Sequence, residues 1–295
     1  MLDAAPWTAI GVPIDSVGRR GGTEHAPRSL RDAGVIEGLG ARDRGDLEVH
    51  IRDERRDDAT GVVGIADVLA MTSAVRAAVR DMVASGERPF ILGGCCSLLP
   101  GAMAGVRDVS GPLGVANVDG HVDVYDGVSS PTGEAADMPV GVALGRAPES
   151  WVAAAGGPST DAAKVIALGA RDEEESADIA PLLAGELAEL LVVGPPELRS
   201  KGPGAAAQRS AESLADRAGR FWLHLDVDVL DELAMPATDY LIPAGLDWDE
   251  LAELLAPLGA SPALAGVSLA CVNPEKDPDG SYVERTARLV AGAFG

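Results

Sequence analysis

The sequence predicts an α/β fold, a three-layer α-β-α sandwich with a mostly parallel central sheet. Short apolar segments rich in β-branched residues alternate with helical patterns from end to end. This alternation is typical of parallel sheets that helices cover on both faces. Glycines and acidic side chains gather where the apolar segments end, which is where such sheets bind ligands. No linker, repeat or low-complexity segment divides the chain, so we expect a single domain over residues 1–295.

Each expected strand is a short apolar run that stops at glycine, proline or acidic residues. The segment 47–51 is the weakest of them, because polar residues surround it from 43 to 58. The segment 220–230 is the longest, and its composition indicates a buried strand. The expected strands are residues 8–13, 47–51, 89–92, 113–118, 164–168, 189–193, 220–230 and 264–269.

The expected helices carry apolar residues at helical spacing or begin at a proline. Residues 61–84 give the clearest pattern, since valine, leucine and methionine recur on one side. Pro27 suits the first turn of the helix that it opens. Two glycine-containing segments, 14–27 and 126–139, are expected loops. The expected helices are residues 27–33, 61–84, 100–106, 140–144, 149–155, 180–187, 205–218, 248–258 and 281–294.

The composition is that of a globular protein with an acidic surface. The chain has 295 residues, of which 46% are hydrophobic, and a formal net charge of −22. Such a charge repels nucleic acid and anionic membranes, and it fits a small cationic substrate. No apolar run approaches the roughly 20 residues of a membrane span, and the first residues show no signal-peptide pattern. We therefore expect a cytoplasmic protein that binds neither nucleic acid nor membrane.

Two acidic clusters at expected strand ends give the strongest chemical signal. Asp226 and Asp228 stand two residues apart, a spacing that puts both carboxylates on one face of a strand. Asp119, His121 and Asp123 alternate in the same way. Like charges on a buried face are costly unless a cation lies between them. Either cluster alone is compatible with acids at a loop tip, but together they indicate a site for divalent metal.

Four motifs resemble those of the ureohydrolase family, which includes arginase, agmatinase and formimidoylglutamase. Residues 119–123 (DGHVD) resemble D-A-H-x-D, and residues 224–231 (HLDVDVLD) resemble S-x-D-x-D-x-x-D-P. Residues 93–97 (GGCCS) resemble G-G-D-H-S, and residues 271–274 (CVNP) resemble E-x-N-P. The resemblance spans nearly the whole chain. It implies an arginase-like fold and a dinuclear manganese site that hydrolyses guanidino or formimino compounds.

Carried over position by position, the resemblance implies two metal ions per chain, with Mn²⁺ as the first expectation. Asp119 and Asp226 would bridge both ions. His121 and Asp228 would complete one site, and Asp123 would serve the other. Hydroxide that bridges the two ions would attack the substrate carbon, because bound metal lowers the pKa of water.

Cys96 stands where the family has a histidine ligand. A thiolate favours softer ions, so Zn²⁺, Fe²⁺, Co²⁺ or Ni²⁺ could replace Mn²⁺. Three interpretations stay open: a substitute ligand, a small buried residue beside a weakened site, and a reactive thiol. The other two cysteines are Cys95 and Cys271, and an odd count with two adjacent members implies no disulfide framework.

The family's proton-shuttle histidine, in an H-G-x-P segment, is absent, because residues 136–139 read ADMP. His224 and His25 could take its place, and a structural role is the alternative for each. Glu134 and Asp137 are further candidates for acid–base work or for contacting the substrate.

The substrate-binding positions also differ from the family pattern. Cys271 replaces a glutamate that pairs with guanidinium in guanidine-hydrolysing members, which disfavours arginine and agmatine as substrates. Glu174 would meet a substrate amine. Asp123 or Asp231 would accept the proton of the attacking water. The resemblance further implies a homo-oligomer, either a trimer or a hexamer.

These observations predict a metal-dependent hydrolase of a linear C–N bond in a guanidino, amidino or formimino compound. The alternative is a non-catalytic homologue that holds one structural metal, since positions 96, 136 and 271 all depart from the family pattern. A single-zinc deacetylase is a third reading, but the other motifs of that class are not evident.

Overall fold

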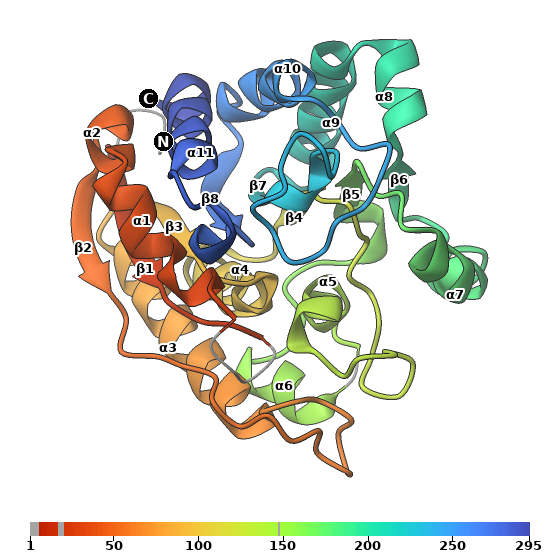
Figure 1. Cartoon of the computed structure of the whole chain (residues 1–295). Coiled ribbons are helices and arrows are strands. Elements are labelled where there is room, and N and C mark those ends of the chain that lie inside the picture. Colours follow the sequence, from red (N-terminus) through yellow and green to blue (C-terminus); the bar gives the residue numbers. More distant parts are fainter. Residues whose placement is uncertain (1–5, 17–20, 147) are drawn as a thin grey trace.

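All eight strands in the described part of the chain pair in parallel, which confirms the predicted α/β fold. The computed structural model describes residues 6–16, 21–146 and 148–295, and helices cover both faces of the sheet (Figure 1). Residues 17–20 of the expected loop 14–27 lie outside the described residues. The strand order is β2-β1-β3-β8-β7-β4-β5-β6. The strands are β1 Trp7–Val12, β2 Arg42–Asp46, β3 Arg88–Gly93, β4 Gly114–Val118, β5 Val165–Leu168, β6 Leu191–Val193, β7 Phe221–Asp226 and β8 Leu264–Ala270.

The two helical layers bury opposite faces of the sheet, because strand side chains alternate between the faces. In β3, Phe90 and Leu92 belong to one apolar core and Ile91 to the other. The first core is covered by α1 Ala26–Asp32, α2 Val35–Leu39, α8 Pro195–Lys201, α9 Pro203–Ala218, α10 Trp248–Gly259 and α11 Ser281–Phe294. The second is covered by α3 Ile65–Ala84, α4 Leu99–Ser110, α5 Pro139–Ala143, α6 Glu149–Ala154 and α7 Glu173–Leu183.

Some predicted boundaries are wrong. The segment 47–51 is not a strand, and β2 lies immediately before it. Every residue of β2 is exposed and its sequence is RDRGD, so the edge strand lacks the apolar pattern on which the prediction depends. The helix predicted at 180–187 begins earlier, as α7, because the Asp172 carboxylate caps it by accepting a hydrogen bond from Glu175 N at 2.6 Å. None of the described helices combines the length and the apolar character that a membrane span needs.

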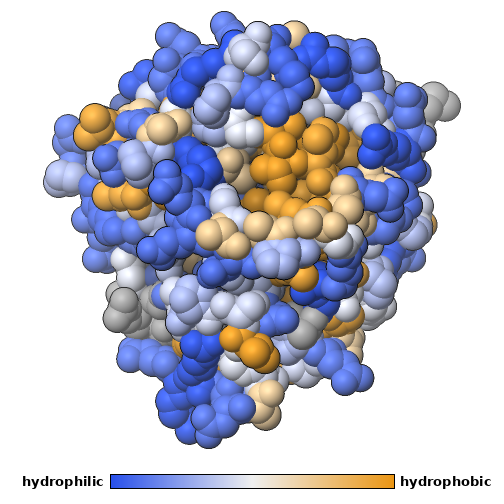
Figure 2. All heavy atoms as spheres, turned by 90° about the vertical axis from the view of Figure 1, so that its right-hand side faces the viewer, coloured by the Kyte–Doolittle hydropathy of each residue, from blue (hydrophilic) through white to orange (hydrophobic). Residues whose placement is uncertain are grey.

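The two edges of the sheet differ in chemistry. The charged side chains of β2 discourage pairing with another strand. At the opposite edge β6 is apolar, and its Leu191 is 48% exposed. Ile166 and Val193 line a shallow depression beside it. Figure 2 shows an apolar area on the side of the molecule that lies to the right in Figure 1, where β6 is found.

Four neighbouring strands, β3, β8, β7 and β4, direct their carboxyl ends to one end of the sheet. The register pairs His224 of β7 with Asn117 of β4 on one side and with Ser268 of β8 on the other. Asp226, the last residue of β7, pairs with Ala270. The segments that follow these strands are far apart in the sequence and meet in space for this reason.

Candidate metal centre

Asp226 and Asp228 are brought together by a turn and not by strand alternation. The expected strand 220–230 is too long, because β7 ends at Asp226 and a 3-10 turn at Val227–Val229 follows it. Asp226 Oδ1 accepts a hydrogen bond from Asp228 N at 2.8 Å, and this bond caps the turn. Both carboxylates are nonetheless buried and lie close together, as predicted.

The second cluster follows β4 and is shaped by two carboxylates. Asp119 Oδ1 accepts from His121 N at 2.7 Å, which folds the loop back on the strand end. Glu175 then accepts from Val122 N at 2.7 Å and from Asp123 N at 2.8 Å. Asp123 has a φ of 60°, an uncommon value for a residue other than glycine. Glu175 therefore holds Asp123 in an orientation that the loop would not favour alone.

Glu175 was not among the predicted site residues, although one signal points to it. It lies four residues before the buried Ile179 on α7, so the two share the buried face of that helix. Burial raises the pKa of Glu175 to about 7, against the lowering effect of His121 and of the two backbone N–H groups. The predicted Glu174 is exposed and lies outside the cavity lining.

His121 is the positive member of the cluster. Its Nδ1 lies 3.1 Å from Asp228 Oδ2 and 3.5 Å from Asp119 Oδ1. Burial lowers the pKa of His121, but the two carboxylates outweigh it and hold the pKa well above its usual value. Asp228 Oδ1 also accepts from Gly120 N at 2.9 Å. A Cβ at Gly120 would lie 2.9 Å from the same oxygen, so a larger residue here would require the Asp228 carboxylate to shift.

The remaining carboxyl groups carry more negative charge than the side chains around them can balance. Burial, followed by the charge of Asp228, raises the pKa of Asp119 to about 6. Burial and neighbouring carboxylates raise the pKa values of Asp123 and Asp226 well above the usual range. Asp123 Oδ2 is buried and finds no hydrogen-bond partner among the described residues. This donor set fits divalent cations, which would supply the missing positive charge.

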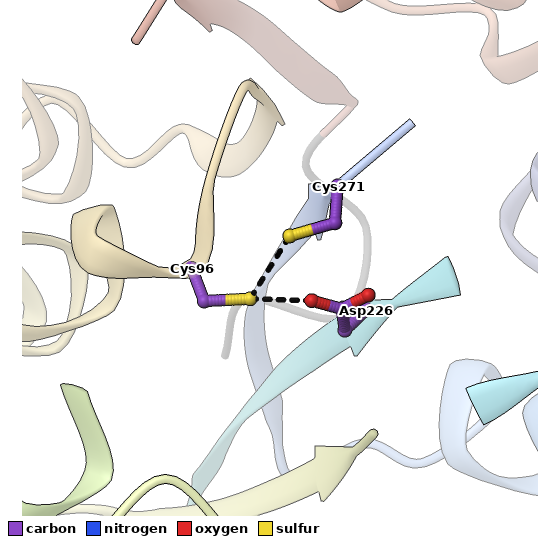
Figure 3. Close-up of side chains that lie close together, drawn as sticks. All are labelled: Cys96, Asp226 and Cys271. Carbon is purple, nitrogen blue, oxygen red and sulfur yellow. Dashed lines mark hydrogen bonds between the residues drawn. The ribbon is translucent and has the colours of Figure 1, made fainter. Parts of the chain in front are cut away.

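Figure 3 shows that Cys96, on the segment after β3, points its sulfur toward Asp226 at the end of β7 and toward Cys271 just after β8. Cys96 Sγ donates a hydrogen bond to Asp226 Oδ2 at 2.6 Å and lies 3.5 Å from Cys271 Sγ. Burial raises the pKa of the Cys96 thiol well above its usual value, so the thiol is protonated when no cation is near. Cys271 has a φ of 65°, and its N–H donates to Gly94 O at 2.6 Å. Strained backbone of this kind clusters at functional sites.

Potential ligand atoms form four overlapping groups, and the atoms within each group lie within 4.8 Å of one another. All the residues implied as ligands by the resemblance occur in these groups. The groups are Asp119, His121 and Asp123; Asp119, Asp226 and Asp228; Cys96, Asp226 and Cys271; and Cys96, Asp119 and His224.

A cavity of about 460 Å³ opens above the cluster. Glu134, Asp137 and Cys271 line it, as expected of substrate-contacting residues. Tyr240 donates to Glu134 Oε2 at 2.5 Å, and Asp137 Oδ2 accepts from two hydroxyl groups at 2.6 Å. Lys276 is the one lysine or arginine among the described lining residues, and it pairs with Asp239 at 2.7 Å. The walls are therefore acidic.

Two predicted catalytic residues lie outside the described lining of this cavity. Asp231 anchors a loop, since its two oxygens accept from Leu233 N at 3.0 Å and Gly245 N at 3.2 Å. His224 is fully buried in β7. The alternative histidine, His25, is exposed.

Arg171 fixes the loop that follows β7. Its guanidinium donates to five backbone oxygens of that loop, at distances of 2.8–3.2 Å. The accepting residues are Asp228, Val229, Leu230, Ile242 and Pro243. Arg171 thereby holds the backbone that carries Asp228.

Comparison with known proteins agrees with this architecture. A model described as the Arginase family matches residues 5–294. An arginase of Brevibacillus brevis is 26% identical over 297 residues, which cover 97% of this chain and 96% of that protein. The native structure of Bacillus caldovelox arginase is 27% identical, covers 99% of this chain and 98% of its own, and superposes with a TM-score of 0.90. A Bacillus subtilis formimidoylglutamase structure shares the fold at 22% identity and a TM-score of 0.77, covering 99% and 86%.

Proposed function

The chain belongs to the arginase family of hydrolases, and from this premise we propose that it hydrolyses a linear C–N bond in a guanidino, amidino or formimino compound. One observation carries the proposal: buried carboxylates from two strand ends converge with His121 at the floor of an acidic cavity. The unbalanced negative charge supports two divalent ions per chain. We expect Mn²⁺ first, with Zn²⁺, Fe²⁺ or Ni²⁺ as alternatives that the Cys96 thiol would favour.

The residues that would hold the ions fall into two sets. Asp119 and Asp226 are common to both sets. His121 and Asp228 would complete one, and Asp123 with Cys96 would complete the other. When bound, the ions would lower the pKa of a water molecule and polarise the substrate carbon.

The chain's own residues would position the substrate and move protons. The acidic walls, including Glu134 and Asp137, would attract a cationic substrate and orient it above the cluster. Asp123 lines the cavity, and its buried Oδ2 has no hydrogen-bond partner among the described residues, so we assign this carboxylate as the proton acceptor. We assign Asp231 to loop anchoring, because backbone N–H groups occupy its two oxygens. Cys271 offers no carboxylate to a guanidinium, which favours amidino or formimino compounds over arginine.

A substrate and metal panel tests the proposal. The chelated protein would be reloaded separately with Mn²⁺, Zn²⁺, Fe²⁺ and Ni²⁺ and assayed on guanidino, amidino, formimino and amide compounds. Release of urea, formamide or ammonia is expected with at least one pair, and Asp228→Asn should abolish it. If no product is released with any metal and the protein binds one ion or none, the result would instead favour the non-catalytic homologue suggested by positions 96, 136 and 271.

We also propose that the chain forms a homo-oligomer, a trimer or a hexamer, as the resemblance implies. The apolar edge at β6 supports a contact between copies. Light scattering coupled to size-exclusion chromatography would give the mass of the assembly. Leu191→Lys should reduce it, whereas Val128→Lys, at a side chain that is 93% exposed elsewhere, should leave it unchanged.

A further inference from the structure

His224 is a buried polar side chain that the proposed mechanism does not use. It is 0% exposed, and its ring lies outside the described cavity lining, so it has no direct route to a substrate. Its Nδ1 lies 2.7 Å from Ser268 Oγ. Its Nε2 is buried and finds no hydrogen-bond partner among the described residues. An unpaired buried nitrogen of this kind destabilises the fold unless another group binds it.

Nε2 is the ring nitrogen that remains available to bind an ion. A ring nitrogen of His224, Cys96 Sγ and a carboxylate oxygen of Asp119 lie within 4.8 Å of one another, and Ser268 already occupies Nδ1. These side chains come from β7, from the segment after β3, and from the end of β4. Bonds of about 2.0–2.3 Å to one ion would need only small movements of the three donors.

The hydrogen bond at Nδ1 suits a metal ligand. Ser268 Oγ accepts from Trp222 Nε1 at 2.9 Å, and its second lone pair can accept Nδ1–H of His224. That tautomer leaves the lone pair of Nε2 directed at the cluster. Metal-binding histidines usually donate their other N–H to such a partner, which fixes the orientation of the ring.

We propose that His224 Nε2 is a ligand of the metal ion on the Cys96 side of the site, together with the Cys96 thiolate and Asp119. The motif that the chain resembles has histidine at the position of Cys96 and serine at the position of His224. In this chain the imidazole comes instead from the neighbouring strand. The resulting nitrogen, sulfur and oxygen donor set favours Zn²⁺, Fe²⁺ or Co²⁺ over Mn²⁺. The inference rests on the proposed function only in that both place metal in this centre.

Co²⁺ provides a probe of this ion that does not depend on catalysis. In the wild-type protein we expect two bound ions and a near-ultraviolet thiolate-to-cobalt absorption band. His224→Asn keeps a donor near Ser268 but has no counterpart of Nε2, so it should weaken the ion on the Cys96 side at least 10-fold and remove the band. His25→Asn changes an exposed histidine and should leave the titration as in the wild type. An unchanged His224→Asn titration and spectrum would overturn the inference.

Two further measurements keep the test decisive if His224→Asn does not fold. Proton NMR of the Co²⁺-loaded wild type should show two hyperfine-shifted exchangeable imidazole N–H signals, from His121 and His224, and a single signal would overturn the inference. The double variant Cys96→His with His224→Ser should bind two ions without the thiolate band, and loss of one ion would contradict it. A protein with the expected spectrum but no hydrolysis would refute the proposed function and leave this ligand assignment intact.

Discussion

Cys96 Sγ donates a hydrogen bond to Asp226 Oδ2 at 2.6 Å, across the gap between the ends of β3 and β7. The thiol proton thus lies beside the carboxylate cluster, where a bound cation would balance the negative charge. Binding of a divalent ion would displace this proton, because only the thiolate is a metal ligand. The residue at position 96 is therefore expected to influence which metal the centre selects.

Replacing Cys96 with serine should change metal selectivity more than fold stability. We expect Cys96→Ser to reduce Zn²⁺ affinity by about 10–100-fold and to change Mn²⁺ affinity much less, because a hydroxyl is a poor ligand for soft ions. Competition with a coloured chelator measures both constants. Cys95→Ser is the matched control, since the adjacent thiol belongs to none of the ligand groups and contacts Ser16 N at 3.4 Å and Thr23 Oγ1 at 3.9 Å. An equal loss of affinity for Zn²⁺ and Mn²⁺ would mean that Cys96 acts through packing and not as a ligand.

Glu175 should matter for metal binding although it is not an expected ligand. Glu175→Gln places an NH₂ group against one of the two backbone N–H donors of Val122 and Asp123. The mismatch should cost about 1–3 kcal/mol of stability and weaken metal binding by about 10–100-fold. Glu174→Gln alters the exposed neighbour and should leave both quantities unchanged. If both variants lost stability and metal affinity equally, the effect would come from the negative charge at the start of α7 and not from the hydrogen bonds of Glu175.

The sequence predicted the sheet because its interior strands are apolar runs bounded by glycine and acids. It placed Asp119, His121 and Asp228 at strand ends, and the structure brings them together there. The predicted geometry was still wrong in one respect: a turn, capped by a hydrogen bond from Asp228 N to the Asp226 carboxylate, joins the two residues in place of strand alternation. Local pattern can locate a ligand, but it cannot show how a turn orients that ligand.

Residues that act across long sequence separations were less predictable. Glu175 reaches the 119–123 loop from α7, and Arg171 reaches backbone oxygens more than 50 residues away. His224 faces Cys96 only because β3, β8 and β7 are neighbours in the sheet. Strand order determines these contacts, and periodicity in one sequence carries no information about strand order.

The metal-free protein should become more stable as the pH falls from 8 to 6.5. Burial raises the pKa of Glu175 to about 7 and that of Asp119 to about 6, so the folded state binds protons that the unfolded state releases near pH 4. The stability that protonated Glu175 and Asp119 contribute is fully present below pH 4. It is lost as the pH rises through their folded-state pKa values. His121, whose pKa is also raised, acts in the same direction.

Two groups oppose this trend only at lower pH. Burial lowers the pKa of His224 to about 4, so the stability that the neutral ring contributes is lost as the pH falls from 6.5 to 4. The pKa of Asp228 is lowered as well, and the stability that its carboxylate contributes is lost only as the pH falls below the usual range of an aspartate. Differential scanning calorimetry in chelator should therefore show a higher Tm at pH 6.5 than at pH 8. Saturating metal should raise the Tm at pH 8 and reverse the order, because protons compete with the ions. A metal-free Tm that rises with pH over this window would contradict the cluster's electrostatics.

Mild oxidation should link Cys96 to Cys271 in the metal-free protein. Their sulfurs lie 3.5 Å apart, so closing to a bond of about 2.05 Å needs a movement of about 1.5 Å. With diamide as oxidant, the two thiols would give up two electrons and two protons, and the diamide would become the hydrazine. The rate should rise with pH, because the thiolate is the attacking species and burial raises the pKa of Cys96.

Bound metal should slow the reaction by holding the Cys96 sulfur, and dithiothreitol should restore metal binding. Peptide mapping identifies the bridge: one between Cys95 and Cys271, or equal rates with and without metal, would show that Cys96 is not the sulfur engaged by the ion.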